Sequence, residues 1–262
     1  MGVKRNWGGE TMTDVNETEL PDSLALAWGL RTRPGRGPRP SLTLDRIVAA
    51  AIAVADADGL AAVSMSRVAG ELGVATMSLY RYVPAKSDLL TLMIDVAPGP
   101  PPAPRAPDEQ WRPALERWAR ALLEALRRHP WVRQVPVTGP PITPQSVAWM
   151  ETGLASLRDT GLRGLEQLST ITLLSNHARE WASLTADMNA AAEAAGETGQ
   201  EAENRYWQQL AMLTATGPFP ALRELIGHLA EEEPEQADAD FAFGLDRILD
   251  GVAVLIEQRR TG

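Results

Sequence analysis

Cysteine is absent from the 262 residues of this chain, so disulfide bonds and thiolate metal sites are excluded and a reducing compartment fits. Long hydrophobic runs are absent as well, since none approaches the about 18–20 residues that a membrane-spanning helix needs. The N-terminus shows no apolar segment followed by a small-residue cleavage site, which argues against a signal peptide. We therefore predict a cytoplasmic protein with no membrane partner.

The sequence also lacks the motifs of common enzymes. It has no glycine-rich phosphate loop, no HExxH motif and no nucleophile elbow, and its three histidines are scattered. We predict that the protein is not an enzyme and has no cofactor. His177 and Glu180 are spaced as a metal pair on one helix face, but a helix-surface pair or a hydrogen-bonded histidine is the simpler interpretation, so no metal site is predicted.

Positive charge is scarce overall but concentrated in one segment. The net charge is -9, yet the segment from Arg31 to Lys86 contains eight basic and four acidic residues. The rest of the chain therefore carries the excess of acid. A basic segment on an acidic body would attract a polyanion such as DNA in one orientation.

Residues 1–40 show no sustained periodicity. Residues 31–40 alternate arginine with proline and glycine and cannot bury a core, so 1–40 are predicted to form a flexible basic arm. Arg36 and Arg39 are then candidates for contacts with phosphates or with a minor groove, and a solvated tail is the alternative. Apolar residues within 24–30 are spaced to dock as a short element.

Three short amphipathic helices are predicted next, followed by a fourth. Thr43 and Ser64 are placed to cap the first and second helices, and Ser87 to cap the fourth. Each short helix would be marginal alone, so together they must bury their apolar stripes. This predicts one small domain over residues 41–96.

The stretch GVATMSLYRYV, residues 73–83, has the layout of a helix-turn-helix recognition unit. Gly73 suits a left-handed C-cap followed by a tight turn. A short helix over Thr76 to Tyr82 then presents small and polar side chains on one side, with Leu79 pointing inward. The sequence therefore predicts a DNA-binding unit.

Beyond a proline-rich boundary at residues 98–107, all strong patterns are helical. Helices are predicted to start near Trp111, Pro144, Gly164, Pro220 and Phe241. The stretch 189–204 is rich in Ala, Glu and Gly and is expected to be mobile. No strand pattern is found, so the predicted fold class is all-α, with a larger helical domain over residues 108–262.

The segment TLDRIVAAAIAVADADGLAAVSMSRVAGELGVATMSLYRYVPAKSDLL resembles the N-terminal domain of TetR-family regulators. RRHPWV, METGLASLRDTGL and FAFGLDRILDGV are similar to the ligand-binding domain of the branch that includes the tetracycline repressor. The resemblance implies a ligand-responsive regulator of transcription, a repressor, that binds a palindromic double-stranded operator and is released by a small apolar or aromatic effector. It also implies a homodimer formed through helices at about 164–185 and 239–258.

The predicted DNA contacts come from the helix-turn-helix unit and the arm. Hydroxyl groups suit phosphates or base edges, the methyl groups of Met and Thr suit a thymine methyl, and Arg and Lys suit guanine edges or phosphates. The candidates are Arg36, Arg39, Ser64, Ser66, Arg67, Thr76, Met77, Ser78, Tyr80, Arg81, Tyr82 and Lys86. Where family members often carry an arginine at the start of the second helix, this chain has Ser66, which puts direct readout from that helix in question.

The predicted effector site follows from tryptophans, six of which lie in the C-terminal domain. A chamber for a flat apolar ligand would be lined by such rings with a few polar groups, although a plain core is the alternative. The candidates are Trp118, Leu122, Trp131, Met150, Leu154, Asn176, His177 and Trp181. A second interpretation of the whole chain is a helical DNA-binding dimer that has no small-molecule ligand and answers to a protein partner.

Overall fold

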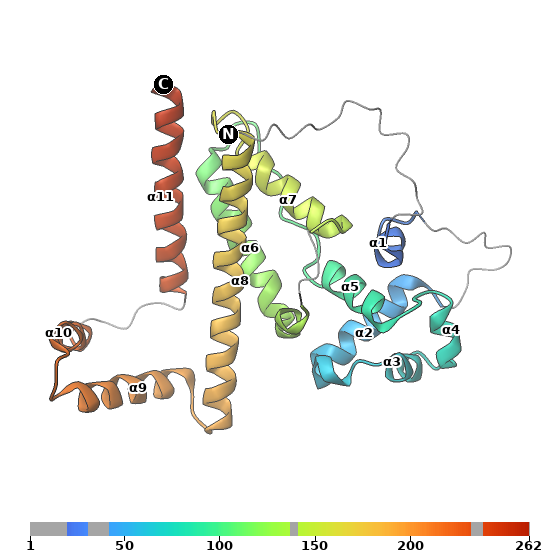
Figure 1. The fold of residues 1–262 in the computed structure, drawn as a ribbon, viewed down its shortest axis with the longest axis horizontal. Coiled ribbons are helices and arrows are strands. Elements are labelled where there is room, and N and C mark those ends of the chain that lie inside the picture. The colour runs from blue at the N-terminus through green and yellow to red at the C-terminus, as the bar shows by residue number, and fades with distance from the viewer. Residues whose placement is uncertain (1–19, 31–41, 137–140, 232–237, 262) are drawn as a thin grey trace, which may run out of the picture. The chain divides into compact units, whose positions relative to one another are not determined.

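The computed structural model describes residues 20–30, 42–136, 141–231 and 238–261, and all regular structure in these ranges is helical (Figure 1). This confirms the all-α prediction. By its contacts the chain divides into two compact units, which are described separately. The first is Met1–Val96 together with Val137–Val147, and the second is Ala97–Pro136 together with Ala148–Gly262.

The described residues of the first unit form five α-helices and one turn of 3-10 helix, besides the first turn of a helix shared with the second unit. They are α1 (Asp22–Ala27), α2 (Leu44–Asp58), η2 (Leu60–Ala62), α3 (Met65–Glu71), α4 (Thr76–Tyr80) and α5 (Lys86–Val96). Helix α2 contacts both α3 and α5, and α3 contacts α4. Ile47, Leu79, Leu89 and Met93 are fully buried and form the centre of this core, which none of the short helices could build alone.

Local capping sets the starts of these helices. The side chain of Thr43 accepts a hydrogen bond from the Arg46 amide at 3.2 Å, and Ser64 accepts one from the Arg67 amide at 3.1 Å, so both predicted caps are confirmed. The prediction that Ser87 caps the fourth helix is wrong. Helix α5 already begins at Lys86, because the Leu89 amide bonds to the carbonyl of Ala85 and starts the helix earlier.

Helix α1 packs against α5. Its Ala25 is buried, and the indole Nε1 of Trp28 donates to the carbonyl of Ile142 at 2.7 Å. Residues 22–27 of the predicted arm are therefore helical and docked within the first unit. The arginines predicted to contact DNA from the arm, Arg36 and Arg39, lie outside the described residues.

The second unit is built on one long helix. Its elements are α6 (Trp111–Arg128), η3 (Pro130–Gln134), α7 (Pro144–Ser156, which begins in the first unit), α8 (Gly164–Ala194), α9 (Gly199–Thr214), α10 (Pro220–Leu229) and α11 (Ala239–Thr261). Helix α8 contacts α6, η3, α9 and α11 (Figure 1). Its neighbours supply the largest fully buried side chains, Trp118 from α6 and Phe241 from α11.

Residues 189–204, which the sequence predicted to be mobile, are mostly helical in this structure. Helix α8 continues to Ala194, and α9 begins at Gly199 after a short break. Alanine and glutamate favour helix, and Thr198 caps α9 by accepting from the Glu201 amide at 3.2 Å. The composition of this stretch therefore concealed the end of α8 and the start of α9, whereas mobility stays a prediction.

The later part of α7 packs very closely against its neighbours within the second unit. A Cβ atom at Gly153 would lie 2.8 Å from Cδ1 of Ile171 on α8 and 3.1 Å from Cε2 of Trp118 on α6. The indole of Trp118 also donates to the carbonyl of Trp149 on α7 at 2.9 Å. A glycine is therefore required where these three helices meet.

The other end of α7 is held inside the first unit. Asp95, near the end of α5, is buried, and its Oδ1 accepts hydrogen bonds from the amides of Gln145 at 2.9 Å and Ser146 at 3.4 Å. These amides belong to the first turn of α7, where no intrahelical acceptor is available. A carboxylate is favoured there by the helix dipole as well.

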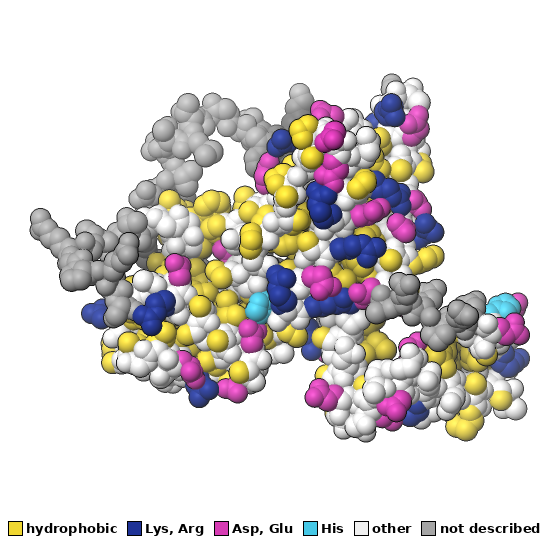
Figure 2. Space-filling model, turned by 180° about the vertical axis from the view of Figure 1, so that it is seen from behind, with side chains coloured by type: hydrophobic (Ala, Val, Ile, Leu, Met, Phe, Trp, Pro, Cys, Tyr) yellow, Lys and Arg dark blue, Asp and Glu magenta, His cyan; other side chains and the backbone are white. Residues whose placement is uncertain are grey.

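Acidic and basic side chains lie next to one another over the helices of the second unit (Figure 2). Arg112 on α6 pairs with Asp250 at 2.7 Å and Asp246 at 3.1 Å on α11. Glu166 at the start of α8 pairs with Arg259 near the end of α11 at 2.5 Å. These pairs fasten the middle and the C-terminal end of α11 to its neighbours.

Helices α9 and α10 extend from the end of α8 and bury little of their own surface (Figure 1). Thr214 is the buried residue of α9, and α10 has none. Within the described ranges, none of the helices combines the length and apolar character of a membrane span.

Candidate nucleic-acid interface and effector cavity

The turn between α3 and α4 is fixed by its backbone. Gly73 has a φ of +65°, a left-handed conformation that favours glycine. The Val74 amide bonds back to the carbonyl of Ala69 at 3.0 Å, which closes the end of α3. A Cβ at Gly73 would meet nothing within 4 Å, so the backbone angle, not space, selects glycine there.

One side of α4 faces the core and the other faces solvent. Leu79 is fully buried, which confirms the predicted inward position. Met77 is 73% exposed and Tyr80 42% exposed, and Arg81 at the end of the helix is exposed. The remaining candidates on this helix, Thr76, Ser78 and Tyr82, are half-buried beside them.

Two cations beside this surface are available for phosphates. Arg81 and Lys86 are exposed, and neither has an ion-pair partner in the part of the chain that the structure describes. Arg67 differs, because its guanidinium pairs with Asp58 and Glu71, each at 3.0 Å. Arg67 therefore serves the packing of α2 and α3 here, and DNA contact by this residue stays a prediction.

The two serines of α3 have different surroundings. Ser64 Oγ is used as the cap and also lies 3.1 Å from Ser66 Oγ. Ser66 is exposed, so its hydroxyl has a free side toward solvent. Such a hydroxyl can donate a hydrogen bond to a phosphate oxygen, but it adds no positive charge.

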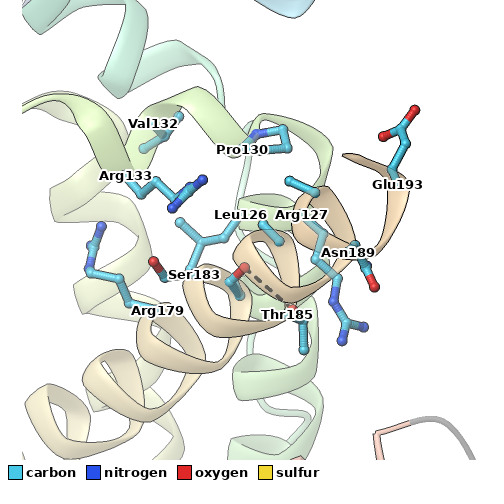
Figure 3. Close-up of a pocket in the computed structure, with 13 residues that line it drawn as sticks. Leu126, Arg127, Pro130, Val132, Arg133, Arg179, Ser183, Thr185, Asn189 and Glu193 are labelled. Carbon is cyan, nitrogen blue, oxygen red and sulfur yellow. Dashed lines mark hydrogen bonds between the residues drawn. The ribbon is translucent and has the colours of Figure 1, made fainter. Parts of the chain in front are cut away.

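A cavity of about 530 Å³ lies in the second unit, between the end of α6, η3 and the later half of α8 (Figure 3). Its apolar lining includes Leu126, Val132, Ala182 and Ala186. Arginines 127, 133 and 179 add polar groups to the lining. Sites for small molecules commonly have this volume and this mixture of apolar walls with few polar groups.

None of the eight predicted effector residues lines this cavity. Trp118, Leu122 and Trp131 are buried in the core, and Trp118 lies edge-on to Trp149 with ring centroids 6.0 Å apart. Met150, Leu154 and Trp181 are half-buried, whereas Asn176 is exposed in a shallow hollow on α8. Their role in effector binding stays a prediction.

His177 is satisfied by its own subunit. Its ring stacks on Phe241 with centroids 4.8 Å apart and an interplanar angle of 6°, and Nε2 lies 3.0 Å from the carbonyl of Phe241. This is the hydrogen-bonded histidine that the sequence favoured over a metal ligand paired with Glu180. In the described ranges, no group of three or more acidic or histidine side chains is placed to hold a metal ion.

Sequence reasoning missed the cavity because it followed large residues. The hollow is made by small ones, Ala182, Ala186 and Ala190, which recur every fourth position on α8 and face the same side. Such a stripe of alanines leaves room that long side chains would fill. The arginines that line the cavity beside these alanines are a second feature of the sequence from which the site could have been found.

The charges around the cavity are mostly neutralised. Arg127 bonds Asp238 bidentately, with Nη1 and Oδ2 2.7 Å apart. The Arg127 hydrogen bond holds the pKa of Asp238 below its ordinary value, and the Trp181 indole adds to the effect. Arg133 pairs with Asp187 at 2.5 Å.

The sequence is similar to known families over both units. Residues 47–93 match bacterial regulatory proteins of the tetR family, and residues 103–256 match the tetracyclin repressor-like C-terminal domain. The chain is 41% identical over 259 residues to the HTH-type transcriptional repressor DrrR1 of Streptomyces coeruleorubidus, covering 97% of this chain and 94% of that protein.

Solved structures of ActR from Streptomyces coelicolor are also similar. The apo form matches with a TM-score of 0.69 at 26% identity, and the complex with actinorhodin with a TM-score of 0.68 at 27% identity. Each comparison covers 84% of this chain and 99% of ActR. The family is one of transcription regulators, which confirms the expectation of a regulator instead of an enzyme. The chain belongs to the tetR family of bacterial regulatory proteins.

Proposed function

We propose that this protein is a homodimeric repressor that binds a palindromic operator and is released by a small, largely apolar effector. The observation that carries the proposal is the outer side of α4. Buried Leu79 fixes the helix, so that exposed Met77, Tyr80 and Arg81 form a reading surface with Lys86 beside it. A short helix presented in this way suits the major groove.

The dimer is supported by apolar side chains that a single subunit leaves uncovered. On α8, Leu165 is 69% exposed, and on α11, Phe243 is 64% exposed. Leu168 and Leu173 on α8 and Val254 on α11 are exposed as well. Two helices with apolar outer faces would bury them by packing against the same helices of a second copy as a four-helix bundle.

Release by a small molecule is supported by the cavity beside α8 and by the ActR complex with actinorhodin. An open hollow of this size favours a small-molecule effector over a purely protein-controlled regulator. The effector would change operator affinity only by binding the two conformations of the dimer with different affinity.

Selection of bound duplexes from a random DNA pool tests the proposal. We expect an inverted repeat whose half-sites are about one helical turn, 34–36 Å, apart. A paired replacement, Met77→Ala with Tyr80→Phe, should alter the selected half-site, whereas Arg158→Met, far along the chain at an exposed position, should not. Recovery of no preferred sequence, or of a single unrepeated site, would refute the proposal.

A further inference from the structure

The cavity beside α8 has one charged group without a counter-ion. Of its three arginines, Arg127 is paired with Asp238 and Arg133 with Asp187. Arg179 has neither an ion pair nor a hydrogen bond in the part of the chain that the structure describes, although it lines the same hollow (Figure 3). The cavity therefore offers one free cation.

The surroundings of Arg179 remove part of the hydration of its guanidinium. This desolvation lowers the pKa of the group below the ordinary value, with no opposing contribution from an acid. The residue is nonetheless exposed, as expected for a group on the wall of an open hollow. Arginine stays protonated in proteins, so the charge persists and an anion that enters the hollow can pair with it.

No acid of the lining can supply that anion. Glu193 is the acidic residue of the lining, and it follows Arg179 by fourteen positions on the same helix. At a rise of 1.5 Å per residue the two are about 21 Å apart along the axis, beyond the reach of both side chains. Asp187 and Asp238, the acids paired with the other two arginines of the lining, are already occupied.

We propose that the cavity binds a ring-containing, mainly apolar molecule that bears an acidic oxyanion, such as a carboxylate, and that Arg179 pairs with this group. Leu126, Val132, Ala182 and Ala186 form the apolar wall for the rings. The planar guanidinium matches an oxyanion through two parallel hydrogen bonds, which makes Arg179 a determinant of ligand class. The regulatory meaning of this site rests on the proposed repressor function, but the binding itself does not.

Two fluorescent probes that differ in one group test the proposal on the full-length protein. 8-Anilinonaphthalene-1-sulfonate carries an aromatic body and an oxyanion, and N-phenyl-1-naphthylamine has the same rings without the sulfonate. Arg179→Met should weaken sulfonate binding by about 10-fold or more, because a hydrogen bond to a charged group is lost. Binding of the neutral probe should change by less than about twofold.

Three further variants keep the result interpretable. Relative to Arg179→Met, Arg179→Lys should restore part of the affinity for the sulfonate, because lysine restores the charge but not the two parallel hydrogen bonds. Ala186→Trp should fill the hollow and weaken both probes by about 10-fold or more. Arg158→Met, which removes an exposed arginine that pairs with Glu151, should leave both affinities unchanged. Circular dichroism and thermal melting of every variant confirm folding.

The proposal is overturned if Arg179→Met leaves sulfonate affinity unchanged, or if it weakens both probes equally. Operator binding of the same preparations is measured without any probe, so failure to bind DNA would count against the repressor function alone. If the sulfonate binds through Arg179, the proposed class of ligand is supported whether or not operator affinity changes.

Discussion

The imidazole of His177 on α8 lies directly against the backbone of Gly244 on α11. A Cβ atom at position 244 would lie 2.8 Å from His177 Nε2. The ring has little freedom to move, because it stacks on Phe241 and its Nε2 lies 3.0 Å from the Phe241 carbonyl. The spacing between α8 and α11 is therefore set by a ring packed on a residue without a side chain.

Gly244→Ala should lower the free energy of unfolding by about 1–3 kcal/mol, since the added methyl group displaces the ring. In a His177→Ala background the same change should cost much less, giving a coupling of about 1 kcal/mol or more. Gly251→Ala, on the same helix with no atom within 4 Å of the added Cβ, is the matched control. Denaturant unfolding of the wild type, the two single variants and the double variant measures this coupling. Additive effects of the two changes would contradict the contact.

If the proposed dimer packs through α8 and α11, Phe243→Glu should convert it to a monomer. It places a charge on each of two symmetry-related apolar faces, where it would be desolvated on association. Sedimentation velocity measures the outcome. Leu225→Glu, which replaces another exposed apolar side chain on α10, is the control and should leave the dimer intact.

Lys86→Met should weaken operator binding without altering which sequence is preferred. Each phosphate contact contributes a slope of about 0.9 to the dependence of log affinity on log salt, so a dimer that loses two contacts should lose about 1.8. Binding measured over a range of salt concentrations gives this slope. Arg67→Met should leave the slope nearly unchanged, because that arginine is paired with Asp58 and Glu71. An unchanged slope for Lys86→Met would remove it from the interface.

Asp95→Ala should destabilise the first unit by about 1–2 kcal/mol, because the amides of Gln145 and Ser146 lose their acceptor. Asp95→Asn should cost less, since its amide oxygen can still accept. Hydrogen exchange at the start of α7 should accelerate in the alanine variant. Equal protection in the wild type and in the alanine variant would show that the carboxylate does not hold the helix end.

Stability should also depend on Glu166 at low pH. Arg259, and then Arg163, lower the pKa of this carboxyl to about 2 from 4.5. Its contribution is complete above the ordinary pKa and is lost as the pH falls from about 4.5 toward 2, because the unfolded chain takes up the proton first. Between pH 4.5 and 2, the melting temperature of Glu166→Gln should therefore fall less than that of the wild type.

The comparison for this titration is Glu151→Gln, which breaks an ion pair between two largely exposed side chains. Its melting profile between pH 4.5 and 2 should follow the wild type. If the melting profile of Glu166→Gln also runs parallel to that of the wild type, the ion pairs of Glu166 contribute nothing to the acid sensitivity.

The features that the sequence predicted well are local. Thr43, Ser64 and Gly73 act within three or four residues of themselves, so their chemistry is visible in the chain. The inward position of Leu79 could be predicted from the helical spacing of the residues around it. The cavity did not follow, because it exists only where the alanines of α8 meet the end of α6, and that meeting depends on the tertiary fold.

Helices α9 and α10 have almost no interior of their own, with Thr214 buried in α9 and no residue buried in α10. A segment that buries so little gains little from cooperative folding and opens at low free energy. In an isolated subunit its amides should exchange with deuterium ahead of those in α6 and α8, and proteases should cut here first. The segment of α9 and α10 should therefore remain folded only to the extent that neighbouring surfaces stabilise it.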